Sequence, residues 1–111
     1  MYCGRDWSPQ ERIESEVFGL DFINDLDPNE FLTDSSWMIE VVDGVDDDAG
    51  DHLEGTPKVV APTGTTAITA TIQRIGGLLP GVTYRVKAVV VTDQGNTKSL
   101  WSHVRGISDE M

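Results

Sequence analysis

Apolar and polar residues alternate along several short stretches of the chain. In 84–91 every second residue from Tyr84 to Val90 is apolar or aromatic, whereas Arg85 and Lys87 fall on the opposite face. A period of two is typical of a half-buried β-strand, because successive side chains of a strand point to opposite faces of the sheet. This stretch is therefore predicted to be a strand with its apolar face in the core.

Similar patterns predict further strands, separated by turns rich in Asn, Asp, Gly and Pro. We expect Trp37 to face the core, and we expect Ile68, Ala70 and Ile72 to face it with the neighbouring threonines in solvent. An edge position is predicted for the strand at 58–61. The predicted strands are 17–23, 36–42, 58–61, 65–75, 84–91 and 97–104, and the clearest turns are 24–30 and the hairpin at 93–96.

Two segments fall outside this alternation. Ser8-Pro9-Gln10-Glu11 has the form of a helix capping box, which predicts one or two helical turns. Residues 43–57 are rich in Gly and Asp, and we expect a long exposed loop there. Since no long helix is indicated, the six or seven strands predict an all-β sandwich.

The 111 residues suffice for one domain. We divide the chain into an N-terminal arm (1–16), a β-sandwich (17–107) and a polar tail (108–111). Ile13 is the chief aliphatic residue of the arm, so the arm cannot form a core of its own. No window is apolar enough for a membrane span, and the first residues lack the apolar region of a secretory signal, so we expect a soluble chain that does not bind membranes.

The net charge of -11 is unevenly distributed. Residues 1–55 carry 16 acidic residues and two basic ones, whereas 56–111 carry three acidic residues and six basic ones. An acidic chain does not favour nucleic acid as a partner, since phosphate binding needs clustered Lys and Arg. The asymmetry is compatible with copies or partners that meet acidic face to basic face, and equally with a solvated acidic loop.

The acidic segment 43–54 is the best candidate for a cation site. It lacks the ligand spacing of a calcium loop, because Val45 takes a ligand position and Asp48 takes the position that needs Gly. A solvated loop, a partner contact and weak divalent binding all remain open for it. His52 and His103 begin no catalytic or zinc pattern, so both are expected at the surface.

No catalytic residue, metal site or cofactor is predicted. Gly76, Gly77 and Gly81 do not form a phosphate loop, because no Gly-Lys-Ser/Thr motif follows. Cys3 is the only cysteine, so an internal disulfide is impossible, and we assign no role to this thiol. The missing disulfide favours folding in a reducing cytoplasm.

Three aromatic residues are candidate partner contacts: Tyr2, Trp7 and Trp101. Tyr2 and Trp7 lie in the polar arm, and Trp101 falls on the face opposite Leu100 and Val104. Exposed tryptophans often anchor protein interfaces, so we expect the arm to dock on a partner. The alternative is that each tryptophan covers one end of the small core.

The segment 78–86 resembles the L-x-P-G-x-x-Y pattern that precedes the sixth strand of fibronectin type III-like domains. The resemblance implies that Pro80 and Gly81 shape a turn and that the Tyr84 hydroxyl bonds back to the backbone of the preceding corner. Trp37, Pro80, Gly81 and Tyr84 are therefore expected to be structural. The implied fold is an immunoglobulin-like or fibronectin type III-like sandwich.

A wider set of motifs resembles small immunoglobulin-like virion proteins of tailed bacteriophages. These motifs are Ser8-Pro9-x-Glu11, Phe18-x-Leu20-Asp21-Phe22, Ser36-Trp37 and Tyr84-x-Val86, followed by a Gly-containing hairpin. The resemblance implies a structural protein of the virion, assembled in the cytoplasm of the bacterial host. A capsid decoration protein that binds the major capsid protein is the leading expectation, with a tail-fibre or head-tail accessory protein as the alternative.

Two other classes remain as rivals. A carbohydrate-binding or surface-binding module would need aromatic side chains clustered on one face, whereas the three tryptophans look dispersed along the sequence. A hydrolase or metal enzyme would need buried polar groups that converge around Asp47, His52 or His103. The sequence predicts neither arrangement.

Overall fold

The computed structural model describes residues 1–4, 6–12 and 14–108. Among them no helix has the length and apolar character needed to cross a membrane. Two short 3₁₀ helices and a series of strands succeed one another: β1 (Gln10–Glu11), β2 (Ser15–Asp21), η1 (Ile23–Asp25), β3 (Leu32–Asp43), η2 (Ala49–His52), β4 (Leu53–Val60), β5 (Ala70–Gly76), β6 (Thr83–Thr92) and β7 (Thr97–Ile107).

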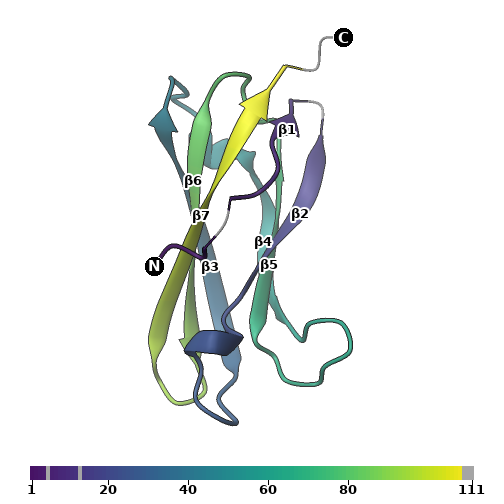
Figure 1. Ribbon diagram of the computed structural model, residues 1–111, viewed down its shortest axis with the longest axis vertical. Coiled ribbons are helices and arrows are strands. Elements are labelled where there is room, and N and C mark those ends of the chain that lie inside the picture. The colour runs from purple at the N-terminus through teal and green to yellow at the C-terminus, as the bar shows by residue number, and fades with distance from the viewer. Residues whose placement is uncertain (5, 13, 109–111) are drawn as a thin grey trace.

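The strands form two sheets that pack face to face (Figure 1). One sheet has the order β1-β7-β6-β3, and the other has the order β2-β5-β4. β1 runs parallel to β7, and every other neighbouring pair is antiparallel. The long axis of the molecule measures 47 Å and both shorter axes measure 25 Å. The prediction of an all-β protein with two packed layers is confirmed.

The core lies between the two sheets and follows the alternation of the sequence. β6 is its centre, because Tyr84, Val86, Ala88 and Val90 are all fully buried, as predicted. The remaining buried hydrophobic residues come from both sheets and their connections: Phe18, Leu20, Phe22, Leu32, Trp37, Ala70, Ile75, Leu78, Val82, Leu100 and Val104. Burial of this apolar surface is the main favourable term in folding.

The predicted inward face of β5 is wrong. Ala70 is buried as expected, but Thr71 and Gln73 are buried as well, whereas Ile72 is only partly buried. The polar side chains are tolerated inside because each has a partner: the Thr71 hydroxyl accepts a hydrogen bond from Trp37 Nε1 (3.0 Å), and Gln73 Nε2 donates to the carbonyl of Glu54 (2.9 Å). A buried polar group costs little once it is hydrogen-bonded.

The helical turn predicted at 8–11 is also wrong. Gln10 and Glu11 form β1 and pair with Gly106 and Ile107 of β7. Gly106 lies so close to Leu79 that any larger residue would collide with the Leu79 carbonyl oxygen. The long-range pairing with β7 overrides the local capping signal.

The segment 43–57 is not one long loop, because η2 and β4 occupy its second half. β4 is an edge strand, as the sequence predicted for 58–61. Ile13 and residues 109–111, which the sequence analysis placed in the arm and the tail, lie outside the described residues. β2 begins at Ser15.

Candidate protein-binding surface

The N-terminal arm lies along β7 and extends the larger sheet. The backbone N–H of Trp101 donates to the Met1 carbonyl (2.8 Å), and the N–H of Cys3 donates to the Trp101 carbonyl (2.9 Å). Further along, the N–H of Trp7 donates to the His103 carbonyl (3.0 Å). The arm is therefore ordered by contacts within its own domain, and its docking on a partner stays a prediction.

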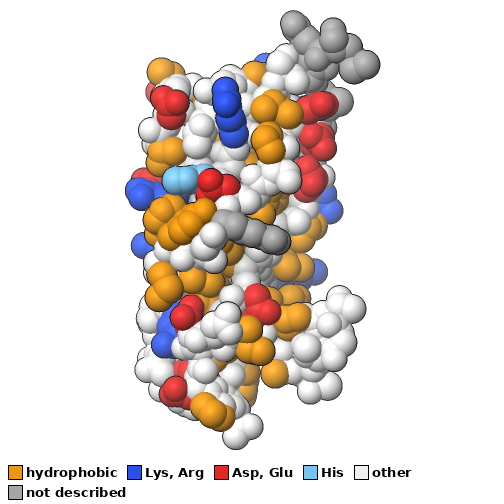
Figure 2. All heavy atoms as spheres, viewed as in Figure 1, with side chains coloured by type: hydrophobic (Ala, Val, Ile, Leu, Met, Phe, Trp, Pro, Cys, Tyr) orange, Lys and Arg blue, Asp and Glu red, His pale blue; other side chains and the backbone are white. Residues whose placement is uncertain are grey.

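This pairing brings Tyr2 next to Trp101 on the outer face of the sheet. The two ring centroids are 4.7 Å apart, and the His103 ring lies 5.1 Å from that of Trp101. Tyr2 is 38% exposed, so the cluster borders solvent. Figure 2 shows histidine atoms among hydrophobic and acidic side chains on the face that carries β7.

Charged side chains of β6 and β3 complete this face. The Arg85 guanidinium lies over the Trp101 ring at 5.4 Å from its centroid, within the range of a cation–π contact. Its Nε donates to Glu40 Oε1 (2.6 Å). We call the set Tyr2, Arg85, Trp101 and His103 the aromatic surface.

A shallow cleft of about 460 Å³ adjoins the aromatic surface. Met38 of β3 forms part of its lining and is 50% exposed. The register places Met38, Lys87 and Trp101 in one row across the three strands. An exposed methionine in a cleft that an aromatic ring also lines provides an adaptable apolar contact for a partner.

Asp6 connects two members of the aromatic surface. The Tyr2 hydroxyl donates a hydrogen bond to Asp6 Oδ1 (2.8 Å), and His103 Nδ1 lies 3.7 Å from the same oxygen. The hydrogen bond to Asp6 holds the proton on the phenol and raises the pKa of Tyr2 above its ordinary value.

Trp7 does not join the aromatic surface. Its ring packs edge-on against Phe18 (4.8 Å between centroids) and is stacked near Trp37 (6.3 Å). Of the three candidate partner residues, the structure brings Tyr2 and Trp101 together and places Trp7 against the core. As in the alternative stated for the tryptophans, the Trp7 side chain covers part of the core, although its contacts with Phe18 and Trp37 lie in the middle of β2 and β3 and not at an end.

The residues expected to be structural lie in the core and at the corner before β6. The Trp37 ring is buried, and Gly81 adopts a positive φ of 81° that favours glycine. Pro80 precedes it in the turn. The Tyr84 hydroxyl accepts a hydrogen bond from the backbone N–H of Leu79 (3.0 Å), which is the contact that the fibronectin-like motif implies.

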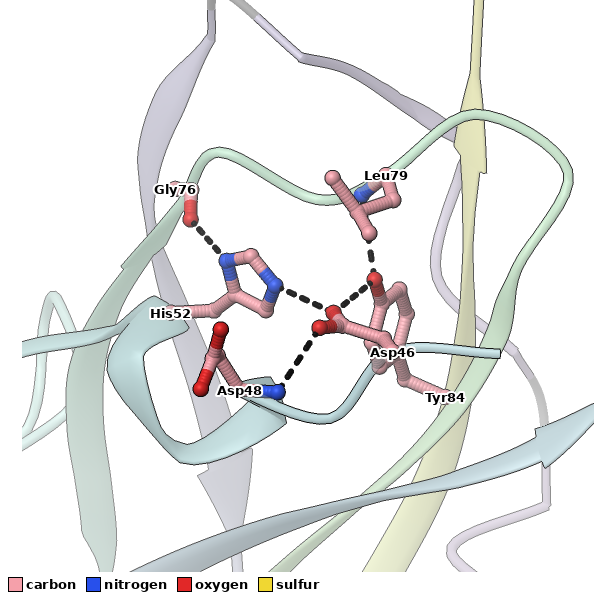
Figure 3. Close-up of polar contacts among 6 residues, drawn as sticks. All are labelled: Asp46, Asp48, His52, Gly76, Leu79 and Tyr84. Atoms are coloured by element: carbon pink, nitrogen blue, oxygen red, sulfur yellow. Dashed lines mark hydrogen bonds and ion pairs between the residues drawn. The ribbon is translucent and has the colours of Figure 1, made fainter. Parts of the chain in front are cut away.

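A second group of polar residues converges on Tyr84 and was missed by the sequence analysis (Figure 3). The Tyr84 hydroxyl donates to Asp46 Oδ2 (2.6 Å), and His52 Nε2 lies 2.6 Å from the same oxygen. His52 Nδ1 lies 3.0 Å from the Gly76 carbonyl oxygen. We call Asp46, His52 and Tyr84 the buried polar cluster.

The prediction that His52 lies at the surface is wrong. The side chain of His52 is 12% exposed and that of Asp46 is 5% exposed. Each ring nitrogen of His52 faces an acceptor, so both contacts are hydrogen bonds only when the ring carries both protons. Asp46 and His52 then form a buried ion pair.

The electrostatics of the buried polar cluster follow from these contacts. Burial opposes ionisation of Asp46, but hydrogen bonds from Tyr84, from His52 and from the backbone N–H of Asp48 outweigh it, so the pKa of Asp46 lies below its ordinary value. Burial, together with the hydrogen bond to Asp46, raises the pKa of Tyr84 far above its ordinary value.

The cluster connects three parts of the chain that are distant in sequence. Asp46 comes from the connection after β3, His52 ends η2, and Tyr84 lies at the start of β6. Because the Tyr84 side chain is fully buried and the Asp46 carboxylate is occupied by three donors, this arrangement stabilises a corner of the fold. The His52 side chain is 12% exposed and that of Asp46 is 5% exposed, so little of the cluster reaches solvent.

Metal binding was one of the possibilities left open for the segment 43–54. Within the described part of the chain, no group of three or more His, Cys, Asp or Glu side chains is arranged to hold a metal ion. Asp46, the most buried carboxylate of the segment, is instead a partner of Tyr84 and His52.

Fold and surface together define an all-β protein of two packed sheets with a partly exposed cluster of aromatic and basic side chains. Comparison of the chain with protein-family models, with curated proteins and with solved structures finds no match. The function therefore has to be argued from the geometry of the surface.

Proposed function

We propose that this chain is a non-enzymatic virion structural protein of a tailed bacteriophage. In this proposal it is a capsid decoration protein that docks on the major capsid protein through the aromatic surface, and it joins the particle in the cytoplasm of the host. The observation that carries the proposal is the partly exposed cluster of Tyr2, Trp101 and His103 under Arg85.

The composition of the aromatic surface supports protein binding. Tyr, Trp and Arg are enriched at protein interfaces and most often contribute the largest share of the binding free energy. Met38 of the adjoining cleft is of another residue type that is enriched there. Tyr2 and Trp101 are held by backbone pairing between the arm and β7. A partner would therefore meet a pre-ordered surface, which lowers the entropic cost of binding.

The immunoglobulin-like part of the proposal is supported by strand order. The orders β7-β6-β3 and β2-β5-β4 correspond to G-F-C and B-E-D of an immunoglobulin-type sandwich, in which Greek-key connections join the two sheets. The hydrogen bond between Leu79 and Tyr84 lies where such domains have their tyrosine corner. Small sandwiches of this kind serve many unrelated functions, so the fold alone does not identify what the chain binds.

A carbohydrate-binding module is the second candidate, because one observation favours it. The sequence suggested dispersed tryptophans, but the structure places Tyr2, Trp101 and His103 side by side. Aromatic faces next to carboxylates such as Asp6 and Glu40 could stack on a sugar ring and accept its hydroxyl protons.

The test is binding of the purified chain to phage particles that lack it, measured by co-sedimentation. We expect saturable binding to wild-type chain, and we expect Trp101→Ala to weaken it by about tenfold or more. Val91→Ala is the matched control, because Val91 is an exposed apolar residue of the same sheet and lies away from Trp101.

Four results would contradict the proposal. Absence of binding to particles would remove the virion role, and unchanged binding by Trp101→Ala would remove the aromatic surface as the docking site. Binding of the chain to a glycan array, lost in Trp101→Ala, would favour the carbohydrate-binding module. Genes for capsid, portal or tail proteins beside the coding sequence are expected, whereas a metabolic operon would contradict the virion role.

A further inference from the structure

The strand edges of the two sheets are not protected to the same degree. β4 contains Pro57 and an irregular register between Glu54 and Lys58, and β3 has register shifts near both of its ends. Prolines and bulges of this kind block the addition of a further strand. β2 has neither: it contains no proline and pairs with β5 in a regular register over all seven of its residues.

Hydrogen bonds at both ends of β2 show which backbone groups face its open side. The N–H of Phe22 donates to the Thr69 carbonyl (2.9 Å), and the N–H of Gly77 donates to the Glu14 carbonyl (3.3 Å). Hydrogen-bonded pairs alternate along an antiparallel ladder, so even-numbered residues of β2 bond to β5. The N–H and C=O groups of the odd-numbered residues Val17 and Gly19 therefore point away from β5.

No other described strand covers this edge. Figure 1 shows β2 at the outer margin of its sheet, and Val17 is 51% exposed. The arm pairs with β7 of the other sheet through the backbone of Met1, Cys3 and Trp7. A cleft of about 470 Å³, lined by Gly4 and Trp7 of the arm and by Gly19 and Asp21, adjoins the edge.

The charge along the edge limits what can pair with it. Glu16 and Asp21 are exposed, and Figure 2 shows acidic side chains gathered along the side of the molecule formed by β2. Around Ser15, Glu54 Oε1 accepts a hydrogen bond from the Ser15 hydroxyl (2.6 Å) and Arg74 Nη1 donates to the Ser15 carbonyl (3.0 Å). Glu16, Asp21 and Glu54 outnumber Arg74, so this edge is acidic, which disfavours pairing with a second copy of the same edge and favours a basic strand.

We propose that the open edge of β2 binds an extended segment of a partner protein that carries Lys or Arg at its flanks, by addition of that segment as a further strand of the β2-β5-β4 sheet. The backbone groups of Val17 and Gly19 supply the ladder hydrogen bonds, and Glu16 and Asp21 select the basic segment. This site lies on the other sheet from the aromatic surface, so it is independent of the function proposed above.

The probes for the test are two acetylated and amidated heptapeptides, Lys-Thr-Val-Thr-Val-Thr-Lys and Glu-Thr-Val-Thr-Val-Thr-Glu, whose length matches β2. Binding to the full chain is followed through the amide NMR signals and amide hydrogen exchange. We expect the lysine peptide to shift and protect the amides of Val17 and Gly19, to bind more weakly at high salt, and to bind more tightly than the glutamate peptide.

The decisive variant is Gly19→Pro, with Gly19→Ala as its matched control. Proline removes the outward N–H of residue 19 and leaves no ladder bond to β5 broken, whereas alanine retains the N–H. A Cβ at residue 19 would make only ordinary contact with Ile72, at 3.4 Å. We expect Gly19→Pro to weaken lysine-peptide binding by about tenfold or more, and we expect Gly19→Ala to bind as wild type.

Glu16→Lys provides a second test if Gly19→Pro does not fold, because Glu16 is exposed and its replacement leaves the backbone unchanged. This variant should lose the preference for the lysine peptide over the glutamate peptide. The proposal is overturned if neither peptide perturbs Val17 and Gly19, if the shifts map to the aromatic surface, or if Glu16→Lys keeps the wild-type preference. A dimer that forms without peptide and is abolished by Gly19→Pro would identify a second copy as the occupant and overturn the basic partner.

Discussion

The same three residue types form two clusters in this molecule, one buried and one exposed. In the buried polar cluster Tyr84 donates to Asp46 at 2.6 Å and His52 contacts the same carboxylate at 2.6 Å. In the exposed arrangement Tyr2 donates to Asp6 at 2.8 Å, and His103 lies 3.7 Å from that carboxylate. The chemistry is similar, but access to solvent differs.

The comparison shows how burial decides what a polar cluster does. Inside the fold an unpaired charge or donor is costly, so the groups around Tyr84 hold one another in place and hold the chain segments that carry them. At the surface water satisfies any group that loses its partner, so Tyr2, Asp6 and His103 add little to stability and remain available for binding.

The largest expected difference between the two clusters is the effect on stability of removing the carboxylate. Asp46→Ala should lower the free energy of unfolding by about 3 kcal/mol, because it leaves the buried groups of His52 and Tyr84 without their acceptor. Asp6→Ala should change it by less than about 0.5 kcal/mol. Urea unfolding at neutral pH measures both, and equal losses for the two variants would contradict the contrast between the clusters.

Removal of the two tyrosine hydroxyls should also lower the free energy of unfolding more in the buried polar cluster than at the surface. The difference should be smaller than for the carboxylates. Tyr84→Phe loses a hydrogen bond to a carboxylate and leaves the Leu79 N–H unpaired, so we expect a loss of about 2 kcal/mol. Tyr2→Phe should be nearly neutral, because Tyr2 is exposed. Denaturant midpoints of the two variants provide the comparison, and a wild-type midpoint for Tyr84→Phe would show that the corner does not depend on its hydroxyl.

Acid should remove the contribution that the buried polar cluster makes to the free energy of unfolding. The pKa of Asp46 is lowered in the folded chain, so its stabilising effect is present above the pKa of the unfolded chain, about 4, and is lost as the pH falls further. The difference in free energy of unfolding between wild type and Asp46→Asn should therefore narrow below about pH 4. A difference in free energy of unfolding that stays constant from pH 7 to pH 2 would indicate that ionisation of Asp46 does not contribute to stability.

The smallest expected effect is that of calcium. Asp46 is occupied by three donors, and the part of the chain that the structure describes contains no group of side chains arranged to hold a metal ion. Millimolar calcium should leave the thermal midpoint of the wild-type chain nearly unchanged. A rise of many degrees, measured by circular dichroism, would mean that the segment 43–54 binds a cation after all.

The fold was largely predictable where apolar residues alternate without interruption. β6 is the best example, since its inward face from Tyr84 to Val90 was predicted correctly. The prediction failed in β5, where the more hydrophobic face is not the buried one. Thr71 and Gln73 are accommodated inside by hydrogen bonds to Trp37 and to the Glu54 carbonyl, and periodicity carries no information about such partners.

The candidate sites were less predictable because they depend on contacts between distant segments. Tyr2 and Trp101 were both named as candidate partner contacts, but only the parallel pairing of the arm with β7 brings their rings together. Asp46 and His52 belong to a Gly- and Asp-rich segment whose composition indicates a solvated loop. The motif that includes Tyr84 indicated a hydrogen bond to the preceding corner, and nothing in that motif indicated the carboxylate that Tyr84 also contacts.

The three tryptophan indole N–H groups allow the most direct test of the claim that the aromatic surface binds the partner. The indole signals of the ¹⁵N-labelled chain can be followed while purified major capsid protein is added. We expect the Trp101 signal to shift or broaden and the Trp37 signal to stay unchanged, because the Trp37 indole is buried and bonded to Thr71. An unchanged Trp101 signal in a complex that demonstrably forms would contradict the account.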